Sequence, residues 1–151
     1  MNGDLSIIGG GITGLTTAIA LNKLGIKCKV YERAPEFAFI GAGIHLSPNA
    51  IKVFKWLGMD EEVVKAGVTL KDAVITHPNL KPLRKSKDVF ISDGSHQYMV
   101  GIHRATLHNI LVKNLPANTL HLDHEFKSFA IHENEIELNF KNTSVKTNFV
   151  L

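Results

Sequence analysis

A chain of 151 residues has room for one hydrophobic core of ordinary size, because domains are most often about 100–150 residues long. Hydrophobic residues make up 44% and charged residues 21%, which excludes a disordered, collagen-like or coiled-coil chain. The formal net charge of +3 is too small to predict a nucleic acid partner without a basic cluster. The basic residues between Lys81 and Lys87 surround Pro82, and we expect them to form a solvated loop.

The single cysteine and the first residues of the chain predict a cytoplasmic protein. Cys28 has no second cysteine with which to form an internal disulfide. It alternates with Ile26 and Val30 in a predicted strand, so we expect it to be a small buried side chain. Residues 1–4 carry no basic charge, and the next apolar stretch is interrupted by glycines and by Lys23. Neither a signal peptide nor a membrane span is therefore predicted.

The first elements along the chain predict a βαβ unit. Residues 5–8 form a short apolar run bounded by glycines, which is typical of a strand buried on both faces. Apolar residues recur at intervals of three and four over residues 12–24, which predicts a helix, and Gly25 follows where a helix would end. Residues 26–31 form the second predicted strand. Strands joined in this way are parallel and have a right-handed crossover.

The middle of the chain predicts two short helices and then an antiparallel segment. The helices span residues 48–57, with Ser47 as N-cap, and residues 60–66. Between residues 68 and 101, short runs alternate with Pro, Gly and Asp, which favours a second sheet inserted into the first domain. The predicted strands in this segment are residues 73–76, 89–92 and 97–100.

The last part of the chain predicts a return to the first domain. A helix over residues 104–114 ends before Pro116, and a strand follows at residues 119–122. Three further strands, at residues 126–132, 135–140 and 147–151, are predicted to form a meander. The chain stops within an apolar, strand-like run, so we expect a truncated chain.

The strongest functional signal lies between the first strand and the first helix. Gly9, Gly11 and Gly14 give the spacing of a dinucleotide-binding turn. The first glycine permits a tight turn, the second lets the backbone approach a pyrophosphate, and the third permits close helix packing. Backbone N–H groups at the helix start, including those of Ile12 and Thr13, would hold the phosphates. A glycine-rich turn without function is the alternative.

Glu32 stands 18 residues after Gly14, at the end of the second predicted strand. A carboxylate at this place accepts hydrogen bonds from ribose hydroxyls. It would repel a 2′-phosphate, so the glycines and Glu32 together predict FAD or NAD rather than NADP.

Four stretches of the chain together resemble the FAD-dependent aromatic monooxygenases of the para-hydroxybenzoate hydroxylase type, the group A flavoprotein hydroxylases. The stretches are residues 6–14, 30–34, 41–50 and 103–108. The resemblance implies an α/β fold: a Rossmann-like FAD-binding βαβ fold with a parallel sheet, an inserted antiparallel substrate-domain segment and a β-meander. It implies FAD-binding elements in residues 1–67, inserted strands in 68–102, and a return to the FAD-binding domain in 103–151. An Asp-Gly motif that follows the last of these strands in the family is missing, so we expect this chain alone to be inactive.

The resemblance also implies roles for individual residues. Glu32 would bind the adenosine ribose with Arg33 beside it, and the loop that contains Gly43 would pass close to the isoalloxazine ring. Arg104 corresponds to an arginine that reaches the FAD, and its guanidinium offers several fixed donors to phosphate or ribityl oxygens. A surface arginine is the alternative for Arg104. Phe126 matches a position whose backbone contacts adenine.

His45 is the predicted catalytic residue, and its Gly-Ala-Gly-Ile-His frame is similar to that of the 6-hydroxynicotinate 3-monooxygenases. A histidine beside the flavin can remove the proton of a ring hydroxyl near neutral pH. A histidine that only hydrogen-bonds the loop or the flavin is the alternative. No metal site is predicted, because the sequence has no cysteine pairs and no His-Glu-x-x-His spacing. The histidines considered are His121 and His124, which cluster with Asp123, and His103 and His108, which are five residues apart and do not share a helical face.

The resemblance therefore implies an FAD-dependent monooxygenase that hydroxylates a small aromatic or heteroaromatic substrate. It would use NADH or NADPH and O2, through a flavin hydroperoxide. Two alternatives remain open at this point. An NAD-linked dehydrogenase is supported by the same glycines but not by the loop after Glu32, and a non-catalytic nucleotide-binding module is the other.

Overall fold

The computed structural model describes residues 4–37, 42–70, 72–87 and 99–151. The chain divides into two compact units: unit 1 comprises Met1–Phe39 and His108–Leu151, and unit 2 comprises Ile40–Leu107. The predicted strand at residues 89–92 lies outside the described residues.

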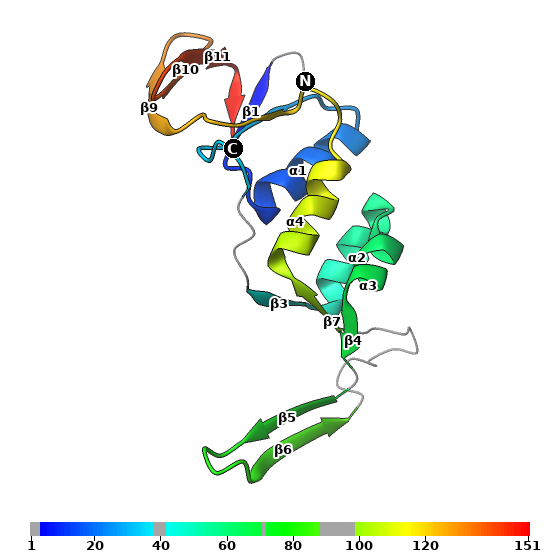
Figure 1. The fold of residues 1–151 in the computed structure, drawn as a ribbon. Helices are drawn as coiled ribbons and strands as arrows, with labels where there is room; N and C mark the ends of the chain where they lie inside the picture. Colours follow the sequence, from blue (N-terminus) through cyan, green and yellow to red (C-terminus); the bar gives the residue numbers. More distant parts are fainter. Residues whose placement is uncertain (1–3, 38–41, 71, 88–98) are drawn as a thin grey trace. The chain divides into compact units, whose positions relative to one another are not determined.

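Unit 1 contains a parallel sheet in the strand order β12-β1-β2-β8. Its strands are β1 (Leu5–Ile8), β2 (Lys29–Tyr31), β8 (Leu120–His121) and β12 (Phe149–Val150). Helix α1 (Ile12–Lys23) connects β1 to β2, and Gly25 follows its end with a positive φ of 77°. Figure 1 shows the strand β1 and the helix α1 in blue. The predicted βαβ unit is therefore confirmed, with a second strand shorter than expected.

The two faces of the parallel sheet pack against different partners within unit 1. Because side chains alternate along a strand, Leu5 and Ile7 share one face of β1 and Ser6 and Ile8 share the other. A Cβ added at Gly14 in α1 would lie 3.4 Å from a methyl carbon of Ile7, so α1 covers the first face.

Cys28 is only partly buried, because it precedes β2 and does not lie within the sheet. The expectation of a buried cysteine was wrong, although its partial burial still raises the pKa of the thiol.

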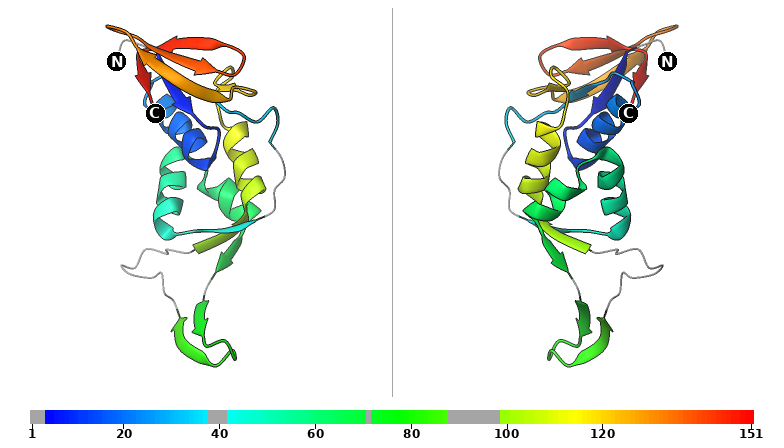
Figure 2. Two further views of the ribbon diagram at one scale, coloured as in Figure 1. Left: turned by 90° about the vertical axis from the view of Figure 1, so that its left-hand side faces the viewer. Right: turned by 90° about the vertical axis from the view of Figure 1, so that its right-hand side faces the viewer.

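The second face of the sheet packs against an antiparallel meander of β9 (Phe126–Ile131), β10 (Ile136–Phe140) and β11 (Ser144–Thr147). Figure 2 shows this layer in orange to red beside β1 and α1 in blue. Tyr31 of the sheet forms a buried cluster with Leu138 and Phe140 of the meander. These contacts join the meander to the strand that precedes Glu32.

The strand predicted at residues 147–151 is present as β12 (Phe149–Val150), but its assignment to the meander was wrong. The meander closes with β11, and the chain then turns so that β12 pairs in parallel with β1. The Thr147 hydroxyl donates to the backbone oxygens of Asp4 and Phe149 at 2.9 and 3.0 Å, which stabilises this turn. On the side of β1 that does not face β2, backbone N–H and C=O groups are available, and β12 forms hydrogen bonds with them.

Unit 2 is built on an antiparallel sheet in the order β3-β7-β4. Its strands are β3 (Gly43–Leu46), β7 (Met99–His103) and β4 (Val68–Leu70), and its helices are α2 (Pro48–Leu57) and α3 (Asp60–Ala66). Both helices confirm the predicted ranges, although the Ser47 side chain makes no capping hydrogen bond. The buried side chains of α2 are Ile51, Phe54 and Leu57, which recur at helical spacing.

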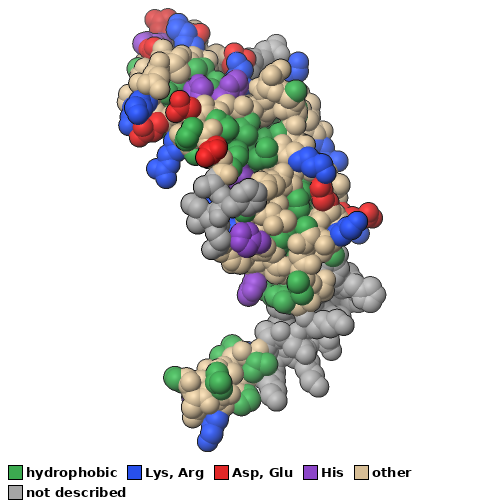
Figure 3. Space-filling model, viewed as in Figure 1, with side chains coloured by type: hydrophobic (Ala, Val, Ile, Leu, Met, Phe, Trp, Pro, Cys, Tyr) green, Lys and Arg blue, Asp and Glu red, His purple; other side chains and the backbone are tan. Residues whose placement is uncertain are grey.

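The strand predicted at residues 73–76 is confirmed as β5 (Asp72–Thr76), but the segment expected to be a basic loop is its hairpin partner β6 (Pro82–Lys87). The charged residues misled the prediction because a two-stranded hairpin exposes both of its faces and therefore tolerates charges. Its apolar side chains are also exposed, with Ile75 at 60% and Leu80 at 79%. Figure 3 shows hydrophobic side chains on the surface of this hairpin.

Helix α4 (Arg104–Lys113) begins in unit 2, and its residues from His108 onward belong to unit 1. Among the described residues, no helix is long and apolar enough to cross a membrane.

Candidate functional site

The turn after β1 holds the fingerprint glycines, and each of them has a different environment. Gly9 adopts a positive φ of 106°, and its N–H donates to the Tyr31 oxygen at 2.8 Å. A Cβ at Gly14 would overlap the Gly9 carbonyl oxygen, so only glycine lets α1 lie this close to the turn. A Cβ at Gly11 would meet nothing within 4 Å, so the space beside this residue is open.

Glu32 closes the turn from the neighbouring strand end. Its Oε2 accepts a hydrogen bond from the Gly10 N–H at 2.7 Å, and its Oε1 accepts one from the Ala34 N–H at 2.9 Å. A carboxylate has about four acceptor positions, so each oxygen retains capacity for a ribose hydroxyl. The glycine turn and the predicted ribose-binding acid are therefore in direct contact.

Two histidines are joined to the backbone of Glu32. The Glu32 N–H donates to the His121 oxygen at 2.9 Å, and the His124 N–H donates to the Glu32 oxygen at 2.8 Å. The His121 ring stacks on Tyr31 at 5.1 Å, and the His124 ring lies 5.3 Å from that of Phe140. These rings are packed as aromatic groups beside the acid.

The Nε2 atom of the His121 ring is buried without a hydrogen-bond partner among the described residues. Burial lowers the pKa of His121, and the neighbouring His124 and Lys29 lower it further. Within the described residues, no three His, Cys, Asp or Glu side chains are grouped so that they could hold a metal ion.

His108 belongs to the site but is not among the residues predicted from the sequence. Its ring is buried, with Nε2 2.7 Å from the Gly10 oxygen, and the ring of Phe37 lies 4.1 Å away edge-on. Its position in the second turn of a helix gives no signal, because Gly10 is 98 residues away.

The other predicted residues of unit 1 lie around this turn. Ile12 and Thr13 begin α1, so their N–H groups have no acceptor within the helix. Arg33 is exposed directly after Glu32. Phe126 begins β9, with its ring 6.2 Å from that of Phe140.

The remaining predicted residues belong to unit 2 and are described within it. The loop expected to contain Gly43 and His45 was wrong in this part, because residues 43–46 pair with β7 as strand β3. His45 is exposed there and pairs with Gly101 of β7. Arg104 is the first residue of α4, with an exposed side chain, and its N–H donates to the Ala42 oxygen at 2.9 Å.

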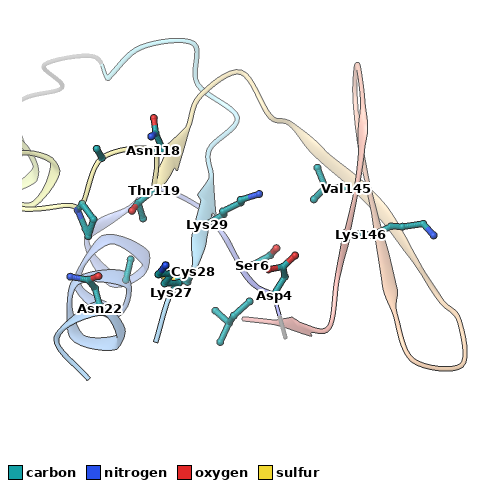
Figure 4. Close-up of a pocket in the computed structure, with 14 residues that line it drawn as sticks. Asp4, Ser6, Asn22, Lys27, Cys28, Lys29, Asn118, Thr119, Val145 and Lys146 are labelled. Carbon is teal, nitrogen blue, oxygen red and sulfur yellow. The ribbon is translucent and has the colours of Figure 1, made fainter. Parts of the chain in front are cut away.

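A cavity of about 370 Å³ lies at the end of the parallel sheet that is opposite to the glycine turn (Figure 4). It is lined by residues at the amino ends of the strands, among them Asp4, Lys29 and Thr119. Because Gly9 and Glu32 follow the carboxyl ends of the same strands, this cavity is separate from the glycine turn.

The glycine turn has the features that an adenine dinucleotide requires. The open space at Gly11 admits a pyrophosphate, the first N–H groups of α1 are donors for its oxygens, and Glu32 has acceptors for ribose. The residues present therefore fit such a group.

Sequence comparison gives the same result. The family model described as "FAD binding domain" matches residues 3–148. The 3-amino-4-hydroxybenzoate 2-monooxygenase of Streptomyces cremeus is 34% identical over 78% of this chain and 30% of its own length. The 6-hydroxynicotinate 3-monooxygenase of Bordetella bronchiseptica is 26% identical over 94% of this chain and 38% of its own length. The chain thus spans about a third of the length of these curated relatives.

Solved structures share the fold. The p-nitrophenol 4-monooxygenase PnpA of Pseudomonas putida matches with a TM-score of 0.84 at 20% identity, over 97% of this chain and 39% of its own. HpxO of Klebsiella pneumoniae, complexed with FAD and uric acid, matches with a TM-score of 0.82 at 20% identity, over 97% of this chain and 38% of its own.

Proposed function

The chain belongs to the family of FAD binding domains, and from this premise we propose that the full-length protein is an FAD-dependent aromatic monooxygenase. The observation that supports the proposal is the hydrogen bond from the Gly10 N–H to the Glu32 carboxylate, next to the open space beside Gly11. The relatives named above, which act on hydroxylated benzoate and nicotinate rings, support a small hydroxylated aromatic or heteroaromatic acid as substrate. As part of the same proposal, the reaction takes place in the cytoplasm.

In this proposal, the residues of unit 1 bind and orient the cofactor. The N–H groups of Gly11, Ile12 and Thr13 donate to the pyrophosphate, and Glu32 accepts from the ribose hydroxyls. The exposed Arg33 lies beside the nucleotide, and the backbone at Phe126 contacts adenine. Bound FAD would supply the transfer of electrons from NADH or NADPH to O2.

The residues of unit 2 have roles toward the flavin and the substrate in this proposal. The backbone around Gly43 passes along the flavin, and the Arg104 guanidinium donates to its phosphate or ribityl oxygens. An imidazole nitrogen of His45 accepts the proton of the substrate hydroxyl and so makes the ring more electron-rich.

The reaction is tested by oxygen labelling. The full-length protein is screened for NADH and NADPH oxidation with phenolic and hydroxypyridine acids, and the best substrate is then turned over under ¹⁸O₂. The proposal expects one labelled oxygen atom in the product and the other in water. A product without label, or no substrate-dependent NAD(P)H oxidation with any acid, contradicts it.

The role of His45 is tested by His45→Gln in the full-length protein. The exposed position in β3 predicts that the variant folds and binds FAD as the wild type does. Hydroxylation is expected to fall about 100-fold near neutral pH, as for loss of a general base, and to recover at high pH where the substrate hydroxyl ionises by itself. His103→Gln, an exposed histidine of β7, is the control. Unchanged turnover in His45→Gln would leave His45 with no part in proton transfer.

A further inference from the structure

The Gly10 residue is held on both sides by side chains from distant parts of the chain. Its N–H donates to Glu32 at 2.7 Å, and its carbonyl oxygen lies 2.7 Å from Nε2 of His108. A carbonyl oxygen only accepts hydrogen bonds, so Nε2 of His108 carries the proton and donates it. The proposed function uses Glu32 but gives no role to His108.

The hydrogen bond from His108 fixes the orientation of the next peptide group. The peptide between Gly10 and Gly11 is planar and trans, so its C=O and N–H point in opposite directions. When the Gly10 oxygen is directed toward His108, the Gly11 N–H is directed away from α4. Glycine at both positions leaves this peptide free to rotate unless a partner holds it.

The imidazole is itself held rigidly. His108 is only 7% exposed, and Phe37 packs edge-on against its ring at 4.1 Å. Leu107 and Leu111 on either side of it in α4 are fully buried. A donor with so little freedom loses little entropy when it holds the turn in one orientation.

We propose that His108 is a positioning residue for the pyrophosphate: by holding the Gly10 oxygen, it directs the Gly11 N–H into the open space where the phosphates bind. The inference rests on the proposed function, because it concerns the same nucleotide site. Two residues then have different roles in that site: Glu32 binds the ribose, and His108 orients the Gly11 N–H that donates to the phosphates.

The test compares ligands with and without phosphates. In the flavin-free full-length protein, dissociation constants are measured for ADP and for adenosine, in the wild type, His108→Leu and His108→Gln. His108→Leu is expected to weaken ADP about tenfold, which is the effect of about one hydrogen bond, and to leave adenosine unchanged. His108→Gln, which retains a donor at a similar distance, is expected to restore ADP binding. His132→Leu removes an exposed histidine of the same unit and is the matched control.

Each outcome decides the inference. Equal losses for ADP and adenosine in His108→Leu would show a merely structural role, and unchanged ADP binding would also overturn the proposal. If His108→Leu does not fold, ¹⁵N NMR of the wild type decides: an Nε2 without a proton excludes the hydrogen bond, and a protonated Nε2 with neutral Nδ1 supports it. A wild-type protein that binds neither FAD nor ADP would refute the proposed function itself, and this inference with it.

Discussion

Glycines three residues apart in the turn after β1 meet different physical requirements. At Gly14, an added Cβ would overlap the Gly9 carbonyl oxygen, so the requirement is one of folding. At Gly11, an added Cβ would meet nothing within 4 Å, and the backbone has an ordinary φ of −75°. The protein alone therefore tolerates alanine at Gly11, and we attribute the glycine there to the ligand.

Paired alanine variants test this distinction. We expect Gly14→Ala to lower the free energy of unfolding by about 1–3 kcal/mol or more, because backbone atoms must move to accept the methyl group. Gly11→Ala is expected to unfold at the wild-type urea concentration or slightly above it, because alanine restricts the unfolded chain. It should nevertheless weaken FAD binding roughly tenfold or more. If Gly11→Ala binds FAD as tightly as the wild type, the pyrophosphate does not approach at Gly11.

The lowered pKa of His121 predicts how the free energy of unfolding depends on pH. Its pKa is lowered from the ordinary value of 6.5, first by burial and then by His124 and Lys29, so the unfolded chain binds the proton more readily than the folded one. The contribution of His121 to stability is therefore present above pH 6.5 and is lost as the pH falls below that value.

Replacing His121 isolates this effect. His121→Phe retains the stacking on Tyr31 and removes the titration. We expect the variant to lose less stability than the wild type between about pH 7.5 and about pH 5.5, measured as the midpoint of urea unfolding. His132→Phe, at an exposed histidine, is expected to behave as the wild type does. An identical pH dependence in His121→Phe and the wild type would show that other groups cause the loss.

At the scale of elements, the sequence predicts what depends on local patterns. The βαβ unit and helices α2 and α3 follow from helical periodicity and glycine punctuation, and they lie close to the expected ranges. The pairing of β12 with β1, which are more than 140 residues apart, has no local signal, because an apolar strand does not specify its partner. The strand predicted at residues 73–76 is present as β5, but its partner β6 was missed because its charges resemble those of a loop.

We expect the meander to stabilise unit 1 through the buried cluster around Tyr31, the residue that precedes Glu32. Leu138 is 1% exposed within this cluster, so Leu138→Ala should lower the free energy of unfolding by about 2–5 kcal/mol. Ile131→Ala, at a 74% exposed residue of the same meander, should change it by less than about 0.5 kcal/mol. Urea unfolding followed by circular dichroism measures both. Equal effects of the two substitutions would mean that the cluster does not form.

At the scale of the whole molecule, the residues given a role toward the nucleotide differ in how far the sequence predicts them. Gly9, Gly11, Gly14 and Glu32 are recognisable because their spacing follows from the geometry of a βαβ turn. His108 is not recognisable, because its contact with the turn depends on tertiary packing across the chain. The roles of the unit 2 residues, His45 and Arg104 among them, derive from resemblance and not from spacing.

Identification of the bound nucleotide shows directly whether the protein is a flavoprotein. The full-length protein is purified, denatured and analysed by absorbance and mass spectrometry for the released nucleotide, before and after incubation with FAD. We expect one FAD per chain in the wild type and much less in Glu32→Ala, which loses the carboxylate that contacts the Gly10 N–H. Release of NAD, or no flavin even after incubation with FAD, would contradict this expectation.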